Sequence, residues 1–265
     1  MPFIETTDGT ALYCKDWGEG PALAFLAGWG VSSDFWQYQL APLSDLGLRC
    51  VAYDRRGHGR SDDPGGGFEY DTLADDLAAV LETRELHDVT LVAHSMAGGE
   101  VVRYLTRHGS ERVRRVVLVA TALGMPRLPP EVGDAVRAVY ASDFAGWARA
   151  NAPAFVGAGL PGCDVSDELV DWALRDMLRA SLRAILDCNR AMLETDFASE
   201  LRAIDVPALL IHGDTDAPIP LETSSAVAVN LIPGARLSVY EHAPHGLMLS
   251  HRGRFNDELL AFAKG

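Results

Sequence analysis

Short apolar runs alternate with longer amphipathic segments along most of this chain. The short runs have strand length and are rich in β-branched and other apolar side chains, and they cover residues 22–27, 49–53, 89–93, 115–120, 207–211 and 235–240. Apolar positions recur at helical spacing over residues 35–46, 70–83, 97–107, 221–231 and 255–263. This alternation predicts an α/β fold with a mostly parallel central sheet, right-handed crossovers and helices on both faces. Ligands of such sheets bind at the carboxyl ends of the strands.

The alternation stops between residues 124 and 203. No strand-like run occurs there, and segments of helical period at 131–140 and 167–186 are separated by Pro- and Gly-containing turns such as GLPGCD. We therefore predict a single domain, in which residues 1–123 and 204–265 form the core and residues 124–203 form a helical cap, or lid. The chain of 265 residues with 48% apolar content is long enough to bury a large core in this way.

Charge and cysteine content make several classes of partner improbable. The formal net charge of -14 repels phosphate backbones and anionic membranes, and no Lys/Arg run offsets it, so we expect neither nucleic acid nor membrane as a partner. The first residues, MPFIETTDGT, lack the features of a leader, and no apolar stretch approaches the ~18 residues of a membrane span. We expect a soluble cytoplasmic protein. The four cysteines lack CxxC spacing, which argues against a disulfide framework and a zinc site. The sequence leaves the formation of a homo-oligomer open.

The segment DVTLVAHSMAGGEVVRYL, residues 88–105, indicates a catalytic nucleophile. A strand leads into Ser95 and a helix begins at once, so the serine hydroxyl is lifted clear of the sheet at the N-terminus of a helix. A serine that only caps the helix is the alternative. Small residues stand at both second neighbours, Ala93 and Ala97, where strand and helix backbones pass close together. This context favours the nucleophile.

A serine hydroxyl needs a base within hydrogen-bond reach and a group that orients the base. In folds with this turn, the chain order is nucleophile, acid, histidine. The strand at 207–211 is followed by HGDTDAPIP, which offers Asp214 and Asp216, and the strand at 235–240 by EHAPHGLML, which offers His242 and His245. The turn TALGMP, after the strand at 115–120, holds no carboxylate, so the acid is expected after the later strand.

Local sequence decides between these candidates. Asp214 directly follows a glycine next to the strand and resembles a turn residue that bonds its own backbone, so we choose Asp216 as the acid. His245 lies further into its loop than His242, between a proline and a glycine, where the chain can bend over the sheet. We therefore predict His245 as the general base.

Two backbone N–H groups are candidates for binding the oxyanion of a tetrahedral intermediate. One belongs to Met96, the residue after the nucleophile, and the other to Trp29, in the loop after the strand at 22–27. Larger apolar side chains of the lid and the late loops are candidates for a substrate pocket, although each could equally be ordinary core. These are Met125, Trp147, Phe155, Met192 and Leu247.

Two other motifs have a structural interpretation. The basic, glycine-rich DRRGHGRSD at residues 54–62 lacks the GxxxxGK[ST] arrangement of phosphate loops, so we interpret it as a structural loop in which Asp54 and the arginines bond locally. His58 is a weak site candidate there. The H-x-x-H spacing of His242 and His245 is weak evidence for zinc, because it lies in a loop without a helix or a flanking Glu. We expect no metal and no organic cofactor.

The chain resembles the cofactor-free, non-heme haloperoxidase and aryl-esterase branch of the α/β-hydrolase superfamily. The matching segments cover the core almost end to end and are AGWGVSSDFW, YDRRGHGRSD, VAHSMAGGEVVRYLTRHG, ETDFASELRAIDVPALLIHGDTD and YEHAPHGLMLSHRGRFNDELLAFAKG. The resemblance implies the α/β-hydrolase fold with a helical lid inserted after its sixth strand. It also implies that Ser95, Asp216 and His245 are the triad and that Trp29 and Met96 are the oxyanion donors.

Some positions depart from the family pattern. Ala27 stands where members have His and Gly30 where they have Pro, and alanines replace both glycines of the nucleophile turn. Because the oxyanion loop places water or peroxide, these changes favour hydrolysis over peroxide chemistry. The lid matches poorly, and its segment DFAGWARANAPAFVG is faintly similar to hydrolase-like signal proteins that bind a small ligand.

The sequence therefore predicts a serine hydrolase that cleaves small or aromatic esters, and possible lactones, through an acyl-enzyme. Members of the resembled branch hydrolyse such esters, and some oxidise halide through a peracid. A cofactor-free perhydrolase or haloperoxidase on the same triad is one alternative. A hydrolase-like receptor of a small signal ligand, with negligible turnover, is the other.

Overall fold

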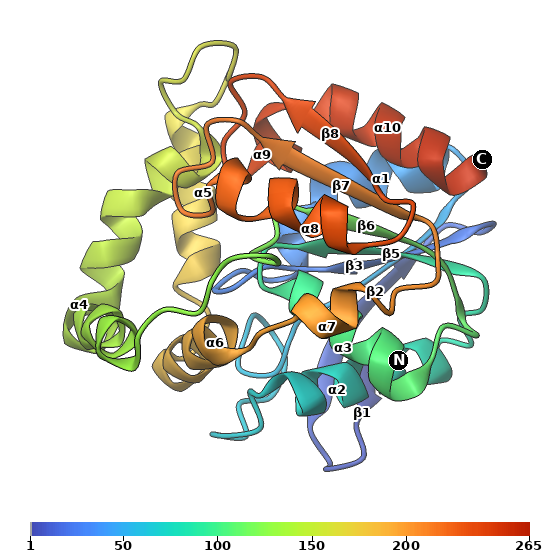
Figure 1. The fold of residues 1–265 in the computed structure, drawn as a ribbon, viewed down its shortest axis with the longest axis horizontal. Coiled ribbons are helices and arrows are strands. Elements are labelled where there is room, and N and C mark those ends of the chain that lie inside the picture. The colour runs from blue at the N-terminus through green and yellow to red at the C-terminus, as the bar shows by residue number, and fades with distance from the viewer. Residues whose placement is uncertain (1) are drawn as a thin grey trace.

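The computed structural model describes residues 2–265, which form an eight-stranded sheet in the order β1-β2-β4-β3-β5-β6-β7-β8 (Figure 1). Strands β3 to β8 run parallel, and the N-terminal strands β1 and β2 pair antiparallel at one edge. The strands are β1 (Phe3–Glu5), β2 (Ala11–Trp17), β3 (Ala22–Leu26), β4 (Arg49–Tyr53), β5 (Val89–His94), β6 (Val113–Val119), β7 (Ala208–Gly213) and β8 (Arg236–Tyr240).

Helices cover both faces of this sheet, as the hydrophobic pattern predicts. One face packs against α2 (Tyr70–Thr83), α3 (Ala97–His108) and α8 (Ser225–Leu231), and the other against α1 (Gln37–Asp45) and α10 (Arg252–Lys264). Successive residues of β5 alternate between the two cores, because side chains of a strand point to opposite faces: Leu91 and Ala93 lie in one and Val92 in the other. Short turns η1 (Ser33–Trp36), η2 (Leu221–Thr223) and α9 (Leu247–Ser250) precede α1, α8 and α10.

The N-terminal hairpin of β1 and β2 was absent from the sequence prediction. Strand β1 is only three residues long, and β2 carries Lys15 and Asp16, which obscure its apolar pattern. Both charges are used in pairing: Lys15 Nζ lies 2.5 Å from Asp34, and Asp16 accepts from Arg49 at 2.7 Å. Because these partners are distant in sequence, the local pattern does not predict β2, and the tertiary structure is needed to explain its charged residues.

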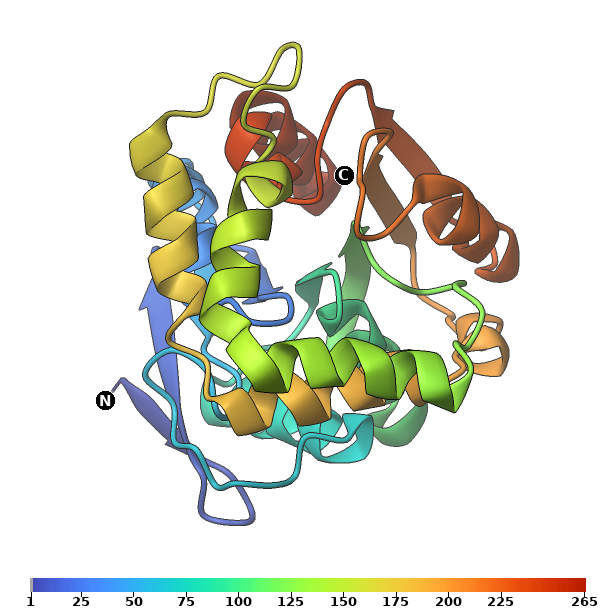
Figure 2. The ribbon, with the colours of Figure 1, turned by 90° about the vertical axis from the view of Figure 1, so that its left-hand side faces the viewer.

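Between β6 and β7 the chain forms a helical insertion. It contains α4 (Pro130–Val156), α5 (Asp167–Met177), α6 (Leu182–Glu194) and α7 (Ala198–Leu201), and α4 packs against α5 and α6 (Figure 2). Residues 124–203, all of them described, contain no strand. The helix predicted over 167–186 is divided in two, because the Ser181 hydroxyl accepts from the Ala184 N–H and caps the start of α6. Helix α4 kinks at Asp143, whose carboxylate accepts from the Gly146 N–H.

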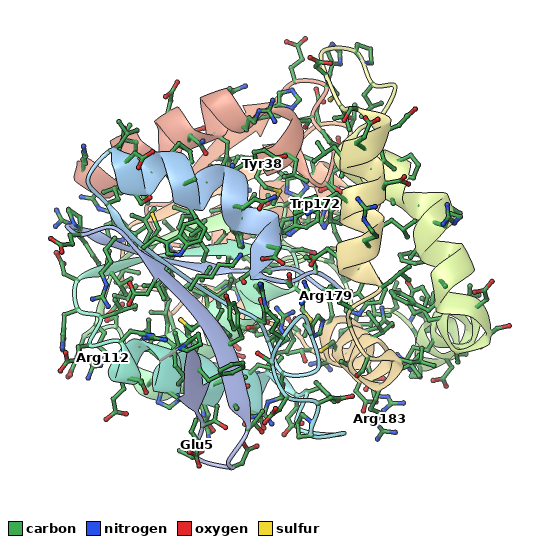
Figure 3. All side chains as sticks on the ribbon, turned by 180° about the vertical axis from the view of Figure 1, so that it is seen from behind. Glu5, Tyr38, Arg112, Trp172, Arg179 and Arg183 are labelled. Carbon is green, nitrogen blue, oxygen red and sulfur yellow. The ribbon has the colours of Figure 1, made fainter. Side chains whose placement is uncertain are left out.

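Aromatic packing and hydrogen bonds join the helical insertion to the loop after β3. Trp172 of α5 stacks on Phe35 with ring centroids 5.4 Å apart and meets Tyr38 edge-on (Figure 3). The buried Asp176 carboxylate accepts from both the N–H and the hydroxyl of Ser32. The wall formed by the insertion is therefore fixed to the core beside the carboxyl ends of the strands. No helix within residues 2–265 is long and apolar enough to cross a membrane.

Candidate active site

A tight turn between β5 and α3 holds Ser95. Its φ of 55° lies in the left-handed region, which costs roughly 1–2 kcal/mol for an L-residue. The Ser95 N–H donates to Val119 O at 2.8 Å, and its carbonyl accepts from the Gly98 N–H at 3.1 Å. A Cβ atom at Gly98 would lie 2.6 Å from Thr121 Cγ2, so α3 approaches the sheet as closely as its backbone allows. This is the strained strand-to-helix turn that the sequence predicts, and it places Ser95 at the N-terminus of α3.

Asp216, in the loop after β7, and His245, in the loop after β8, are paired. His245 Nδ1 lies 2.7 Å from Asp216 Oδ2, and both side chains are buried. The second carboxylate oxygen accepts from the Ile219 N–H at 2.9 Å. Burial raises the pKa of Asp216, but the charge of His245 and hydrogen bonds from His212 and His245 outweigh it, so the pKa lies below its ordinary value. Asp216 is therefore an anion that fixes a proton on His245 Nδ1.

A second histidine, His212 on β7, contacts the same carboxylate. Its Nε2 lies 3.2 Å from Asp216 Oδ2 and 2.8 Å from the Ile219 carbonyl, and its Nδ1 lies 2.8 Å from the Ser225 hydroxyl. Since a carbonyl can only accept, Nε2 carries the proton and Nδ1 accepts from Ser225. His212 was not predicted as a site residue, although it stands in the HGDTD motif.

Asp214 and His242, the alternatives to Asp216 and His245, contact each other. Asp214 accepts from the His242 N–H at 2.6 Å, and the His242 side chain is about half exposed. Asp214 was expected to bond its own backbone, but it bonds the neighbouring loop instead. This bond ties the loop after β7 to the loop after β8, because the two strands are adjacent and parallel.

His94, the residue before Ser95, holds the backbone of His245. His94 Nε2 lies 3.1 Å from the His245 carbonyl, so Nε2 is the protonated nitrogen, and the two rings are 4.6 Å apart. Burial, followed by the charge of His245, holds the pKa of His94 well below its ordinary value. His94 is thus a neutral hydrogen-bond donor, a role that no local sequence pattern indicates.

The loop after β3 is held by the DRRGHGRSD segment. Arg55 donates to the carbonyls of Ala27 and Gly28 and is paired with the buried Glu100 of α3. His58 Nε2 accepts from the Gly30 N–H at 3.2 Å, while its Nδ1 donates to a carbonyl. Burial, followed by the charge of Arg55, lowers the pKa of His58 to about 3, so it stays neutral. The weak site candidate His58 is therefore a support of the loop.

This loop lies directly against the nucleophile turn. A Cβ atom at Gly28 would lie 3.1 Å from Ser95 Cβ and 2.6 Å from His94 Nδ1. Within residues 2–265, no hydrogen bond uses the backbone N–H of Trp29 or of Met96 as its donor. The two predicted oxyanion donors are thus unpaired N–H groups on adjoining loops.

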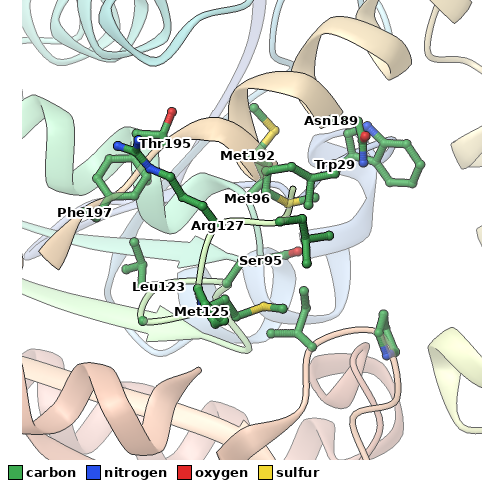
Figure 4. A pocket seen from close by; sticks show the side chains of 18 of the residues that line it. Trp29, Ser95, Met96, Leu123, Met125, Arg127, Asn189, Met192, Thr195 and Phe197 are labelled. Atoms are coloured by element: carbon green, nitrogen blue, oxygen red, sulfur yellow. The ribbon is translucent and has the colours of Figure 1, made fainter. Parts of the chain in front are cut away.

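Ser95 and His245 both line one cavity of about 510 Å³ between the core and the helical insertion (Figure 4). This volume is typical of a small-molecule site. Of the predicted pocket residues, Met125, Trp147, Phe155 and Met192 line the cavity. Leu247 does not: it is fully buried in the core at the start of α9, because the chain turns inward after His245. Sequence analysis also missed Asn189 of α6, a buried polar residue of the cavity wall.

Comparisons with known proteins show the family of this chain. A family model described as alpha/beta hydrolase fold matches residues 21–161. The chain belongs to the α/β-hydrolase superfamily, in its non-heme haloperoxidase branch. A non-heme haloperoxidase of Rhodococcus erythropolis is 41% identical over 99% of both chains. A bifunctional esterase/perhydrolase of Acinetobacter calcoaceticus is 34% identical over the full length of both. The crystal structure of a bromoperoxidase from Bacillus anthracis superposes with a TM-score of 0.93, at 32% identity and 99% coverage of both chains.

Among the described residues, no group of three or more His, Cys, Asp or Glu side chains could hold a metal ion.

Proposed function

We propose that this protein cleaves carboxylic esters, including lactones, of small or aromatic substrates through an acyl-enzyme on Ser95. The observation that carries the proposal is the buried hydrogen bond between His245 Nδ1 and Asp216, on a histidine that shares its cavity with Ser95. The general class of activity does not depend on these residues. By its membership of this branch, the chain is a hydrolase that acts on ester bonds.

The proposed mechanism uses the tautomer that the structure imposes on His245. Because Asp216 can only accept, the proton lies on His245 Nδ1 and the lone pair lies on Nε2. His245 Nε2 removes the hydroxyl proton of Ser95 as Oγ attacks the substrate carbonyl, and Asp216 stabilises the imidazolium. His245 then protonates the leaving alkoxide, and the acyl group stays on Ser95. A water molecule, activated in the same way, releases the acid.

The unpaired N–H groups of Trp29 and Met96 are the proposed donors to the oxyanion. Each such donor contributes roughly 3 kcal/mol to lowering the barrier, provided that it is held in place before the reaction. Arg55 and His58 hold the Trp29 loop by its neighbouring backbone atoms, so the donor does not have to be ordered at the moment of reaction.

The test of the proposed function is the hydrolysis of p-nitrophenyl acetate by wild-type protein and by Ser95→Ala. We expect steady turnover by the wild type and a loss of at least about 10³-fold in kcat for the variant, because the acyl-enzyme cannot form. Circular dichroism checks that the variant is folded. An unchanged rate in folded Ser95→Ala would refute the proposal. A single burst of p-nitrophenol followed by silence would instead favour the receptor of a small ligand.

A second candidate is perhydrolysis, which the esterase/perhydrolase relative and the haloperoxidase relative favour. Hydrogen peroxide would then replace water as the attacking group on the acyl-enzyme and release a peracid. The peracid would oxidise bromide to hypobromous acid and return to the carboxylate. Bromination of a dye with acetate, peroxide and bromide measures this activity. A signal that persists in Ser95→Ala would show that the activity does not use the triad.

A further inference from the structure

Helix α6 turns one face toward the body of the protein, and one residue of this face is polar. Cys188 and Asn189 follow Ile185 by three and four residues, and Met192 follows them by four and three, which places all four on the same side of the helix. Asn189 is only 3% exposed. An apolar residue is the ordinary choice at such a position, because burial of a carboxamide costs free energy unless its hydrogen bonds are satisfied.

Among the residues that the structure describes, the Asn189 carboxamide has no hydrogen-bond partner. Its Oδ1 atom is buried without a hydrogen bond, and no side-chain bond of Asn189 occurs within residues 2–265. Another polar group of the same cavity is satisfied: the Tyr70 hydroxyl donates to the Met96 carbonyl at 3.2 Å. Asn189 is therefore a polar group that the wall of the cavity leaves open.

The position of Asn189 connects it with the proposed site. The Trp29 indole Nε1 donates at 2.9 Å to the Ile185 carbonyl, which in an α-helix also accepts from the Asn189 N–H. Figure 4 labels the Trp29 and Asn189 side chains. The residue therefore lies on the turn of α6 that is bonded to Trp29. Its side chain lines the cavity that holds Ser95 and His245.

We propose that Asn189 binds a hydroxyl group of the substrate, so that the preferred esters or lactones carry a hydroxyl away from the carbonyl that is cleaved. This inference rests on the proposed function. A carboxamide accepts through its oxygen and donates through its NH₂ group, and a hydroxyl is the smallest group that does both in return. The rest of the wall is mainly apolar, with Trp29, Met96 and Met192 close by, so it suits an otherwise apolar substrate.

Matched substrates separate this role from general packing. Two series serve as probes, p-nitrophenyl esters of 3- and 6-hydroxy acids and acetate esters of hydroxyalkyl alcohols, each compared with its deoxy parent. We expect kcat/KM of the wild type to favour at least one hydroxylated member over its parent by about tenfold or more, because a site built for a hydroxyl discriminates against its absence. A ratio near one for every pair would overturn the proposal.

The decisive variant is Asn189→Leu, which keeps the size of the side chain and removes its polar atoms. We expect the ratio of kcat/KM for the hydroxylated substrate to that for its deoxy parent to fall to about one. Only the value for the hydroxylated substrate should drop, while that for the deoxy parent stays within about threefold. The melting temperature should rise, because an unsatisfied polar group is replaced by an apolar one. A variant with the wild-type ratio, or one with a lower melting temperature and an equal loss on both substrates, would contradict the proposal.

Asn230→Leu is the matched control, since Asn230 lies on the exposed surface of α8 and its side chain donates to the Ala226 carbonyl of its own helix. It should retain the wild-type ratio. Ser95→Ala, measured on the deoxy parents, tests the proposed function separately. If these parents are hydrolysed through Ser95 and the ratio is still one, the inference about Asn189 fails alone. If Ser95→Ala keeps the wild-type rate, the proposed function fails, whatever the ratio shows.

Discussion

Two regions enclose the same cavity but are built differently. One is the set of loops at the carboxyl ends of the strands, called the rim here, and the other is the wall formed by the helical insertion. On the rim, buried polar groups hold one another: Asp216 contacts two histidines, His94 bonds the His245 carbonyl, and Arg55 bonds the loop beside Trp29. The insertion contributes mainly apolar side chains, and its buried carboxamide at Asn189 finds no hydrogen-bond partner in the described part of the chain.

This difference separates two tasks. Groups that transfer protons or bind an oxyanion must be held within a fraction of an ångström, which needs supporting hydrogen bonds. A wall that recognises the substrate needs shape and a few unsatisfied groups for the ligand to complete. We therefore expect changes on the rim to lower kcat, and changes in the wall to alter the choice of substrate.

The largest effect is expected for Asp216→Asn. An amide at this position permits the wrong tautomer of His245 and no longer stabilises the imidazolium, so kcat should fall roughly 10³- to 10⁴-fold. The measurement is p-nitrophenyl acetate hydrolysis by the folded variant. Asp214→Asn is the control, since the Asp214 carboxylate accepts from the His242 N–H and not from His245. Should Asp214→Asn suffer the larger loss, the assignment of the acid would be reversed.

An intermediate effect is expected for His58→Leu. Removal of the acceptor for the Gly30 N–H loosens the loop that carries Trp29, the proposed oxyanion donor. We therefore expect kcat to fall about tenfold while KM stays within twofold, as for an interaction made in the transition state. His108→Leu, a change at the surface of α3, is the control. A raised KM with an unchanged kcat would instead argue that His58 acts on substrate binding.

The smallest effect is expected for His94→Phe and concerns stability. Native His94 has a pKa well below that of the unfolded chain, so below about pH 6.5 only the unfolded state takes up this proton, and stability falls as the pH drops. The free energy of unfolding should therefore depend less steeply on pH in the variant, by about 1.4 kcal/mol per pH unit between pH 4.5 and 6. Urea titrations over this range give the slope, and identical slopes would disagree with a neutral buried His94.

The sequence predicts much of the core because its signals are local. The strand and helix at Ser95, the small residues beside it, and the parallel strands β3 to β8 follow from periodicity and turn chemistry within short windows. The hairpin of β1 and β2 was missed, since the charges of β2 are paired with residues far along the chain. The division of the 167–186 helix was missed as well, because it depends on the cap at Ser181.

By itself, the sequence determined the fold class, and it supplied the candidate site residues on which the proposed chemistry rests, because spacing and residue type carry this information. Only the tertiary structure decided which polar groups lack a partner, that Leu247 belongs to the core, and that His94, His212 and Arg55 support the site. The physical reason is that hydrogen bonding in a buried site joins atoms from distant segments, and whether a group is satisfied depends on all of them together.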